Sequence, residues 1–141
     1  MSMNLLAVFV ENKPGQTARV TRILAENGVN ICWVTIASSG HFGVMKFLVD
    51  KQEQAVASLR AEGLMVSLPE VLAVEVENKP GSLRGVAELL EQHSINLDNC
   101  SGFVANNRAI LVVETQALAE ARAVLEQQGF QLLSQEQMQR L

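Results

Sequence analysis

The chain has little of what marks a membrane, disulfide-stabilised or nucleic-acid-binding protein. Its 141 residues include two cysteines, three prolines, one tryptophan and no tyrosine. No apolar run approaches the ~20 residues that a membrane-spanning helix needs. Lysine and arginine total 11 against 15 acidic residues, and no cationic run gathers them. We therefore expect neither a membrane nor a nucleic acid among the partners.

The scarcity of cysteine also limits the chemistry. Cys32 and Cys100 belong to no C-x-x-C pair and have no histidine at ligand spacing. They are expected to be reduced, mostly buried thiols, with a disulfide between the two halves as the minor alternative. Residues 1–4 lack the basic segment and apolar run of a secretory signal, so a cytoplasmic location is expected. No metal site and no cofactor is predicted.

What the chain does contain is an internal repeat. A shift of 66 residues places Glu11-Asn12-Lys13-Pro14-Gly15 on Glu77-Asn78-Lys79-Pro80-Gly81. The same shift matches further positions without a gap: Leu6, Ala7, Val8, Val10, Val20, Leu24, Asn30, Ala55, Leu59 and Gly63 recur as Leu72, Ala73, Val74, Val76, Val86, Leu90, Asn96, Ala121, Leu125 and Gly129. The sequence therefore predicts two copies of one fold, domains 1–69 and 70–141.

Each copy shows the same order of local patterns. In the first copy, the aliphatic run 5–10 predicts a strand, and apolar residues at helical spacing from residue 16 predict a helix that ends at Gly28. Residues 29–37 and 42–49 predict a hairpin, which is followed by a helix at 52–62 and a strand at 64–68. The second copy predicts a strand at 71–76, a helix at 82–93, a hairpin at 95–114 turning near 106–107, a helix at 117–128 and a strand at 130–134. This β-α-β-β-α-β order predicts an α+β, ferredoxin-like unit, an antiparallel sheet with both helices on one face.

Only Pro69-Glu70 separates the copies, which is too short for a flexible linker. We expect a rigid side-by-side pair. Two arrangements stay open: edge strands that meet in one long sheet, or final strands exchanged between the copies.

The repeated loop has a structural and a chemical interpretation. As a turn, Asn and Gly tolerate unusual backbone angles and Pro presets φ. As a site, free N–H groups at a helix start suit a small carboxylate, and an Asn amide offers both a donor and an acceptor to an amino acid. Asn30 and Asn96, each at the start of the next strand, are expected to add a second amide close by.

These residues resemble the ACT domain, a ligand-binding unit attached to many enzymes of amino-acid metabolism. The resemblance lies in Asn12-Lys13-Pro14-Gly15 followed by Gly28-Val29-Asn30-Ile31, and in Asn78-Lys79-Pro80-Gly81 followed by Ser94-Ile95-Asn96-Leu97. The resemblance covers essentially the whole chain, once in each copy. The chain is similar to stand-alone tandem ACT proteins that carry no catalytic domain.

The resemblance implies a free amino acid bound between paired units at the strand-to-helix loops. In the serine-sensing domain of phosphoglycerate dehydrogenase, the loop Asn and the later Asn before Ile contact the effector. By motif position, these two residues correspond to Asn12 and Asn30 in the first copy, and to Asn78 and Asn96 in the second. That loop also carries a His where this chain has Val10 and Val76, so serine is not assumed. The expected ligand-binding residues are Asn12, Lys13, Pro14, Gly15, Asn30, Ile31, Asn78, Lys79, Pro80, Gly81, Asn96, Leu97 and Asp98.

Asp98 has two interpretations, a partner for a ligand ammonium or a solvated strand carboxylate. The catalytic motifs of hydrolases, zinc proteases and nucleotide-binding enzymes are lacking, and the histidines His41 and His93 do not recur at matching positions. We therefore expect a non-catalytic regulatory protein, a homodimer that acts on an enzyme or regulator. The alternative is an ACT-like interaction module without a small-molecule ligand.

Overall fold

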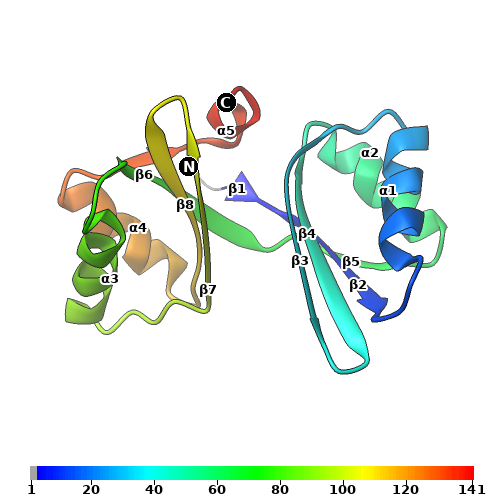
Figure 1. The fold of residues 1–141 in the computed structure, drawn as a ribbon, viewed down its shortest axis with the longest axis horizontal. Coiled ribbons are helices and arrows are strands. Elements are labelled where there is room, and N and C mark those ends of the chain that lie inside the picture. The colour runs from blue at the N-terminus through cyan, green and yellow to red at the C-terminus, as the bar shows by residue number, and fades with distance from the viewer. Residues whose placement is uncertain (1–2) are drawn as a thin grey trace. The chain divides into compact units, whose positions relative to one another are not determined.

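The computed structural model describes residues 3–141, which divide into two compact units (Figure 1). Asn4–Pro69 form the N-terminal unit, and Glu70–Leu141, joined by Met3, form the C-terminal unit. The first two residues of the expected domain 1–69 lie outside the described residues. None of the described helices is long and apolar enough to cross a membrane.

The N-terminal unit has the expected order of elements. It contains β2 (Leu6–Glu11), α1 (Gln16–Glu26), β3 (Ile31–Ser39), β4 (Phe42–Val49), α2 (Gln52–Ala61) and β5 (Met65–Ser67). Its four strands form an antiparallel sheet in the order β3-β4-β2-β5. The first strand, β2, therefore lies at the centre, and the loop that follows it leaves from the middle of one sheet end.

The C-terminal unit repeats this arrangement. It contains β6 (Glu70–Glu77), α3 (Ser82–Gln92), β7 (Asn99–Ala105), β8 (Arg108–Glu114), α4 (Leu118–Gln127) and β9 (Gln131–Leu133). Here β6 takes the central place of β2, between β8 and β9. Two further elements have no counterpart in the repeat: β1 (Met3–Asn4) pairs with β6, and α5 (Gln135–Gln139) ends the chain.

The open question of strand exchange is answered by the pairing. β5 returns to β2 and β9 returns to β6, so each final strand completes the sheet of its own copy. The described strands form two sheets, a five-stranded one and a four-stranded one.

One face of each sheet carries both helices and holds the core. In the N-terminal unit, β2 and β4 residues pack with Leu24 of α1 and Leu59 of α2, both fully buried. In the C-terminal unit the matching residues are Leu90 of α3 and Leu125 of α4. Burial of each such side chain contributes about 1.5–3 kcal/mol, and the shared apolar pattern explains why both copies adopt one fold.

Candidate functional site

The strand-to-helix loop has the same backbone conformation in both units. Gly15, immediately before α1, has φ of 93°, and Gly81, immediately before α3, has φ of 90°. This left-handed region costs an L-residue with a side chain roughly 1–2 kcal/mol, which explains glycine at both positions. The N–H of Lys13 donates to the Glu11 carbonyl and that of Lys79 to the Glu77 carbonyl, each over 3.0 Å.

Both helices that follow these loops begin without a side-chain cap. Neither α1 nor α3 has a side-chain hydrogen bond at its N-cap, and neither carries an acidic residue in its first turn. The positive end of each helix dipole is therefore not offset by a nearby carboxylate of its own first turn. Lys13 and Lys79 instead pair with Glu11 and Glu77 at the strand ends, over 3.4 and 3.0 Å.

The loop asparagines differ between the units. Asn12 Nδ2 donates to the Gly40 carbonyl over 3.0 Å, and its backbone N–H donates to the His41 carbonyl over 2.7 Å. Asn12 thus ties the loop to the β3–β4 turn. In the described part of the chain, the Asn78 side chain makes no such bond. Because its amide is exposed, Asn78 keeps its donors and acceptor available.

The second pair of asparagines lies at the other end of each sheet, which corrects the expectation that the two amides of a unit are neighbours. Ile31 pairs with Val49 whereas Glu11 pairs with Phe42, so Asn30 and Asn12 are separated along β4. In the C-terminal unit, Asn99 pairs with Glu114 and Glu77 with Arg108. At about 3.3 Å per residue the separation is roughly 20 Å or more in both units. The physical reason is that β3 runs parallel to β2, since both are antiparallel to β4.

These distant residues have local partners. The Asn30 N–H donates to Asp50 Oδ1 over 2.9 Å. Asn96 Nδ2 donates to Asp98 Oδ1 over 3.3 Å, and the Asn96 carbonyl accepts from the Thr115 hydroxyl over 2.7 Å. Asp98 is exposed, as are both asparagines, whereas Ile31 and Leu97 are half-buried. A small ligand bound within one unit therefore cannot contact both of its asparagine amides.

The loops also border two cavities that occupy equivalent places. The C-terminal groove measures about 650 Å³ and is lined by Glu75, Val76, Glu77, Lys79, Gly81, Ser82, Gly85, Asn107, Arg108, Gln128, Gly129, Phe130 and Gln131. The N-terminal groove measures about 390 Å³ and is lined by Phe9, Val10, Glu11, Gln16, Arg19, Phe42, Gly43, Leu64 and Met65. Every lining position of the smaller groove has its 66-residue counterpart in or next to the larger one.

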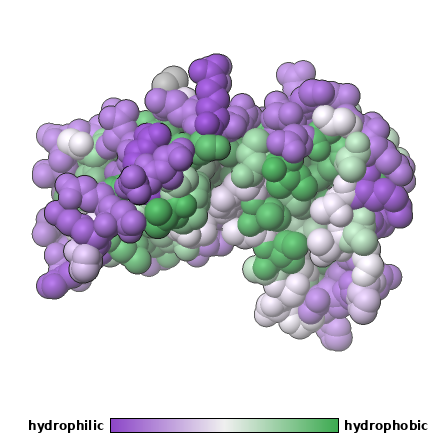
Figure 2. All heavy atoms as spheres, turned by 45° about the horizontal axis from the view of Figure 1, so that its top comes forward, coloured by the Kyte–Doolittle hydropathy of each residue, from purple (hydrophilic) through white to green (hydrophobic). Residues whose placement is uncertain are grey.

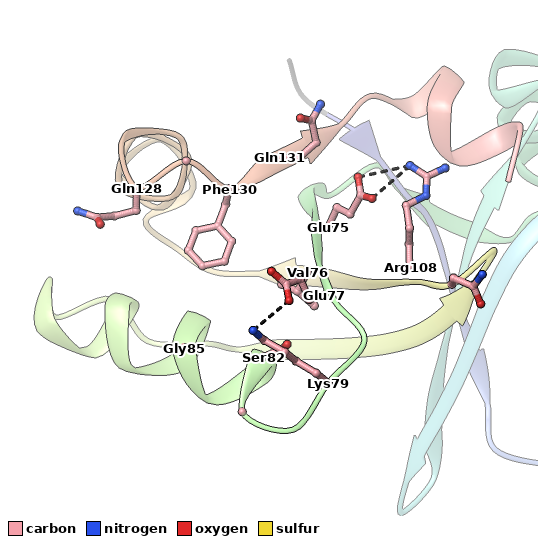
Figure 3. Close-up of a pocket in the computed structure, with 13 residues that line it drawn as sticks. Glu75, Val76, Glu77, Lys79, Ser82, Gly85, Arg108, Gln128, Phe130 and Gln131 are labelled. Carbon is pink, nitrogen blue, oxygen red and sulfur yellow. Dashed lines mark hydrogen bonds and ion pairs between the residues drawn. The ribbon is translucent and has the colours of Figure 1, made fainter.

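The linings of these equivalent grooves differ in chemistry. Glu75, Arg108 and Gln131 take the places of Phe9, Phe42 and Met65. Arg108 Nη1 lies 3.3 Å from Glu75 Oε1, an ion pair drawn in Figure 3 beside that of Glu77 and Lys79. Phe9 is 44% exposed, and Phe42 and Met65 are both 71% exposed. On the face drawn in Figure 2, green hydrophobic areas lie among purple hydrophilic side chains.

A second difference concerns the helices. Arg19 of α1 donates from Nη2 to the Glu62 carbonyl at the end of α2, over 3.0 Å. The counterpart of Arg19 is Gly85, where an added Cβ would meet nothing within 4 Å. In the described residues no side chain makes the matching bond to the Gln128 carbonyl at the end of α4. The space that Arg19 crosses in the N-terminal unit is therefore open in the C-terminal unit.

The two thiols differ from the sequence-based expectation. Cys100 is half-buried, but Cys32 is exposed, as are Val34 and Ile36 at alternate positions of β3. Burial raises the pKa of both thiols, and the nearby Asp50 carboxylate raises that of Cys32 further. Both thiols are therefore poor nucleophiles near neutral pH. Within residues 3–141 no cluster of His, Cys, Asp and Glu is arranged to hold a metal ion.

The fold and its repeated loop define a tandem pair of small ferredoxin-like α+β units. A family model described as an ACT domain pair matches residues 1–141, and the chain belongs to this family. This confirms the resemblance inferred from the Asn-x-Pro-Gly motifs and the ferredoxin-like fold of both copies.

Solved structures agree with this assignment. The crystal structure of protein BT0572 from Bacteroides thetaiotaomicron is 26% identical, covers 100% of this chain and 98% of its own, and superposes with a TM-score of 0.93. The ligand-free regulatory subunit of aspartate kinase from Thermus thermophilus is 18% identical, with coverage of 88% and 91% and a TM-score of 0.63. The second likeness shows a shared fold. No curated protein sequence matches this one.

The sequence interpretation missed the grooves. It selected residues that are identical in the two copies, whereas Glu75, Gly85 and Arg108 stand where the copies differ. A signal was present: three large apolar side chains in one copy correspond to polar ones in the other, at positions that flank the conserved loop pattern of the repeat.

Proposed function

We propose that this chain is a non-catalytic regulatory protein that binds a free amino acid at its strand-to-helix loops. The observation that carries the proposal is the loop itself: an identical Asn-Lys-Pro-Gly segment, with glycine in the same left-handed conformation, precedes an uncapped helix in each unit. Uncapped N–H groups at a helix start attract a carboxylate, the one group that every free amino acid carries.

Membership of the ACT domain pair family supports this assignment. The fold is shared with regulatory subunits of aspartate kinase, whose name describes regulation of an enzyme that acts on an amino acid. By analogy, we propose that ligand binding in this chain shifts the population of a form that acts on a partner enzyme or regulator. The free energy available for that shift equals the difference in ligand affinity between the two forms.

We further propose that the protein acts as a homodimer in the cytoplasm. The loop asparagines and the strand asparagines lie at opposite sheet ends within each unit, so a site between paired units can combine Asn12 or Asn78 of one unit with Asn30 or Asn96 of another. In a two-fold pair each copy presents the same surface to the other, so a site formed at the interface occurs twice.

The test is thermal unfolding of the full chain with each of the twenty L-amino acids at millimolar concentration. A ligand present at about 100 times its Kd adds about 2.7 kcal/mol, which raises Tm by several degrees for a chain of this size. We expect one amino acid, or a small chemical group of them, to raise Tm. A panel without any shift, from a well-folded sample, contradicts amino-acid binding.

Asn78→Ala is the cleaner of the two loop variants. The Asn12 side chain holds the β3–β4 turn, so Asn12→Ala lowers the stability of the unliganded protein as well. Asn78→Ala removes an exposed amide without that bond. If Asn78 contacts the ligand, this variant keeps the unliganded Tm and loses part of the ligand-induced shift.

One observation favours the interaction module as a second candidate function. One face of the N-terminal sheet carries the side chains of Phe9, Phe42 and Met65. Phe9 pairs with Met65, and Phe42 pairs with Glu11, which lies two residues after Phe9 on the same face of β2. Exposed apolar side chains grouped in this way are typical of surfaces that contact another protein. This alternative is supported if the protein binds none of the amino acids but binds a specific partner protein, and if Phe42→Ser abolishes binding of that partner.

A further inference from the structure

We propose that each chain has one binding site for a zwitterionic amino acid, the C-terminal groove, and that Arg19 fills the equivalent place in the N-terminal unit. This inference rests on the proposed binding of an amino acid at the strand-to-helix loops, and it places the ligand in the groove beside one loop and not in a site shared between paired units.

Gly85 is the first observation. It lies inside α3, without a positive φ, and a Cβ there would meet nothing within 4 Å. Neither backbone geometry nor close packing therefore calls for glycine, although glycine in a helix interior costs roughly 0.5–1 kcal/mol relative to alanine. Gly85 does line the C-terminal groove, where any side chain would project into the free space. A ligand in the groove would explain why position 85 carries no side chain.

Arg19 shows what kind of group the groove accepts. Its guanidinium donates to the Glu62 carbonyl at the C-terminal end of α2. That end carries unsatisfied carbonyls and the negative pole of the helix dipole, both of which favour a cation. In the C-terminal unit the same place belongs to Gln128, after α4, and no described side chain reaches its carbonyl. A ligand ammonium can occupy there the position that the guanidinium occupies in the other copy.

The opposite side of the C-terminal groove suits a carboxylate. The start of α3, which has no side-chain cap, contributes Gly81 and Ser82 to the lining. The Ser82 N–H already donates to the Lys79 carbonyl over 3.3 Å and Lys79 Nζ pairs with Glu77 over 3.0 Å, so the attraction for a carboxylate comes from the dipole of α3. The groove therefore lies between the positive end of α3 and the negative end of α4, and Figure 3 shows Phe130 pointing from the start of β9 into the space near Gly85. A molecule with one charge of each sign can align with both helix ends.

The charges of the lining agree with such a ligand. Two carboxylates, Glu75 and Glu77, and two cations, Lys79 and Arg108, line the groove, so its formal charge is balanced. A phosphate or a nucleotide calls for an excess of positive charge, and a polyamine calls for the reverse. The volume of about 650 Å³ lies within the ordinary range of small-molecule pockets, roughly 300–1,000 Å³.

The experiment is calorimetric titration of the full chain with each of the twenty L-amino acids. Three variants are measured beside the wild type: Gly85→Arg, which copies the N-terminal unit, Gly85→Leu, which fills the space without charge, and the matched control Arg19→Ala. Circular dichroism and the unliganded Tm of each variant establish that it folds. For the amino acid that binds, its N-acetyl derivative and its methyl ester are titrated as well.

We expect one ligand molecule per wild-type chain, loss of binding in both Gly85 variants, and wild-type affinity in Arg19→Ala. Both blocked derivatives should fail to bind, since each lacks one of the two charges. Two molecules per chain, unchanged affinity in folded Gly85→Leu, or loss of binding in folded Arg19→Ala would overturn the groove assignment while leaving amino-acid binding in place. No binding of any amino acid to the wild type would instead overturn both this assignment and the proposed function.

Discussion

The two units share their fold and differ in the side chains around their grooves. Their loops have the same conformation, with Gly15 and Gly81 at φ of 93° and 90°, and their cores place leucine at matching positions of all four helices. Around the grooves, by contrast, Arg19 corresponds to Gly85 and the exposed Phe9 corresponds to Glu75. The two units therefore share their cores and the backbone of the loop, and they differ in the side chains around the grooves.

This contrast separates two requirements on a repeated fold. Residues that close the core or set the chain direction must be kept in both copies, because each copy forms its own sheet and its own core. Surface positions around the loop are free to change in one copy as long as the other keeps its role. A duplicated unit can therefore hold one site for a polar ligand and use the equivalent surface of its twin for something else.

The largest expected effect tests the equivalence of the cores. Leu59→Ala in α2 and Leu125→Ala in α4 each remove a fully buried side chain, so each should cost about 2–5 kcal/mol of unfolding free energy. Denaturant unfolding gives the total cost, and hydrogen exchange followed by mass spectrometry assigns it to a unit. If one variant costs less than half as much as the other, the two cores are not energetically equivalent.

The next effect concerns two glycines four residues apart, Gly81 at the N-cap of α3 and Gly85 within the helix. Gly81→Ala forces an alanine to φ near 90° and should lower stability by roughly 1–2 kcal/mol. Gly85→Ala, four residues on, adds a helix-favouring methyl group to free space and should raise stability by about 0.5–1 kcal/mol. Thermal unfolding measures the stability of both variants. A lower stability of Gly85→Ala would mean that the added methyl group meets neighbouring atoms, contrary to the open space in the structure.

A smaller effect tests the difference in surface chemistry. The double variant Phe9→Glu, Phe42→Arg places on the N-terminal unit the ion pair that Glu75 and Arg108 form on the C-terminal unit. Because an exposed ion pair contributes only about 0–1 kcal/mol, stability should change little. Fluorescence of a dye that binds exposed apolar surface should fall clearly. Unchanged dye binding would show that these phenylalanines form no accessible apolar surface.

The sequence predicted most of the fold because the information for it is stated twice. Identity of Asn12–Gly15 with Asn78–Gly81, and of Leu59 with Leu125, determined the order of elements and the core. β1 and α5 were missed because they lie outside the repeat. The distance between Asn12 and Asn30 was misjudged because it depends on the direction of β3 relative to β2, which local sequence patterns do not show. The grooves depend on side chains from four separate elements, and no local pattern in the sequence brings these together.

The smallest effect compares the two thiols. Burial raises the pKa of both Cys32 and Cys100, and the Asp50 carboxylate raises that of Cys32 further, since it disfavours a second negative charge nearby. Alkylation by iodoacetamide proceeds through the thiolate, so both rates should stay low at neutral pH and rise toward alkaline pH, beyond the range of an unperturbed thiol. Asp50→Asn retains the oxygen that accepts from the Asn30 N–H but removes the charge. It should speed alkylation of Cys32 and leave Cys100 unchanged, as measured for each peptide by mass spectrometry. Equal acceleration of both thiols would indicate a general loosening of the fold in place of a local effect of charge.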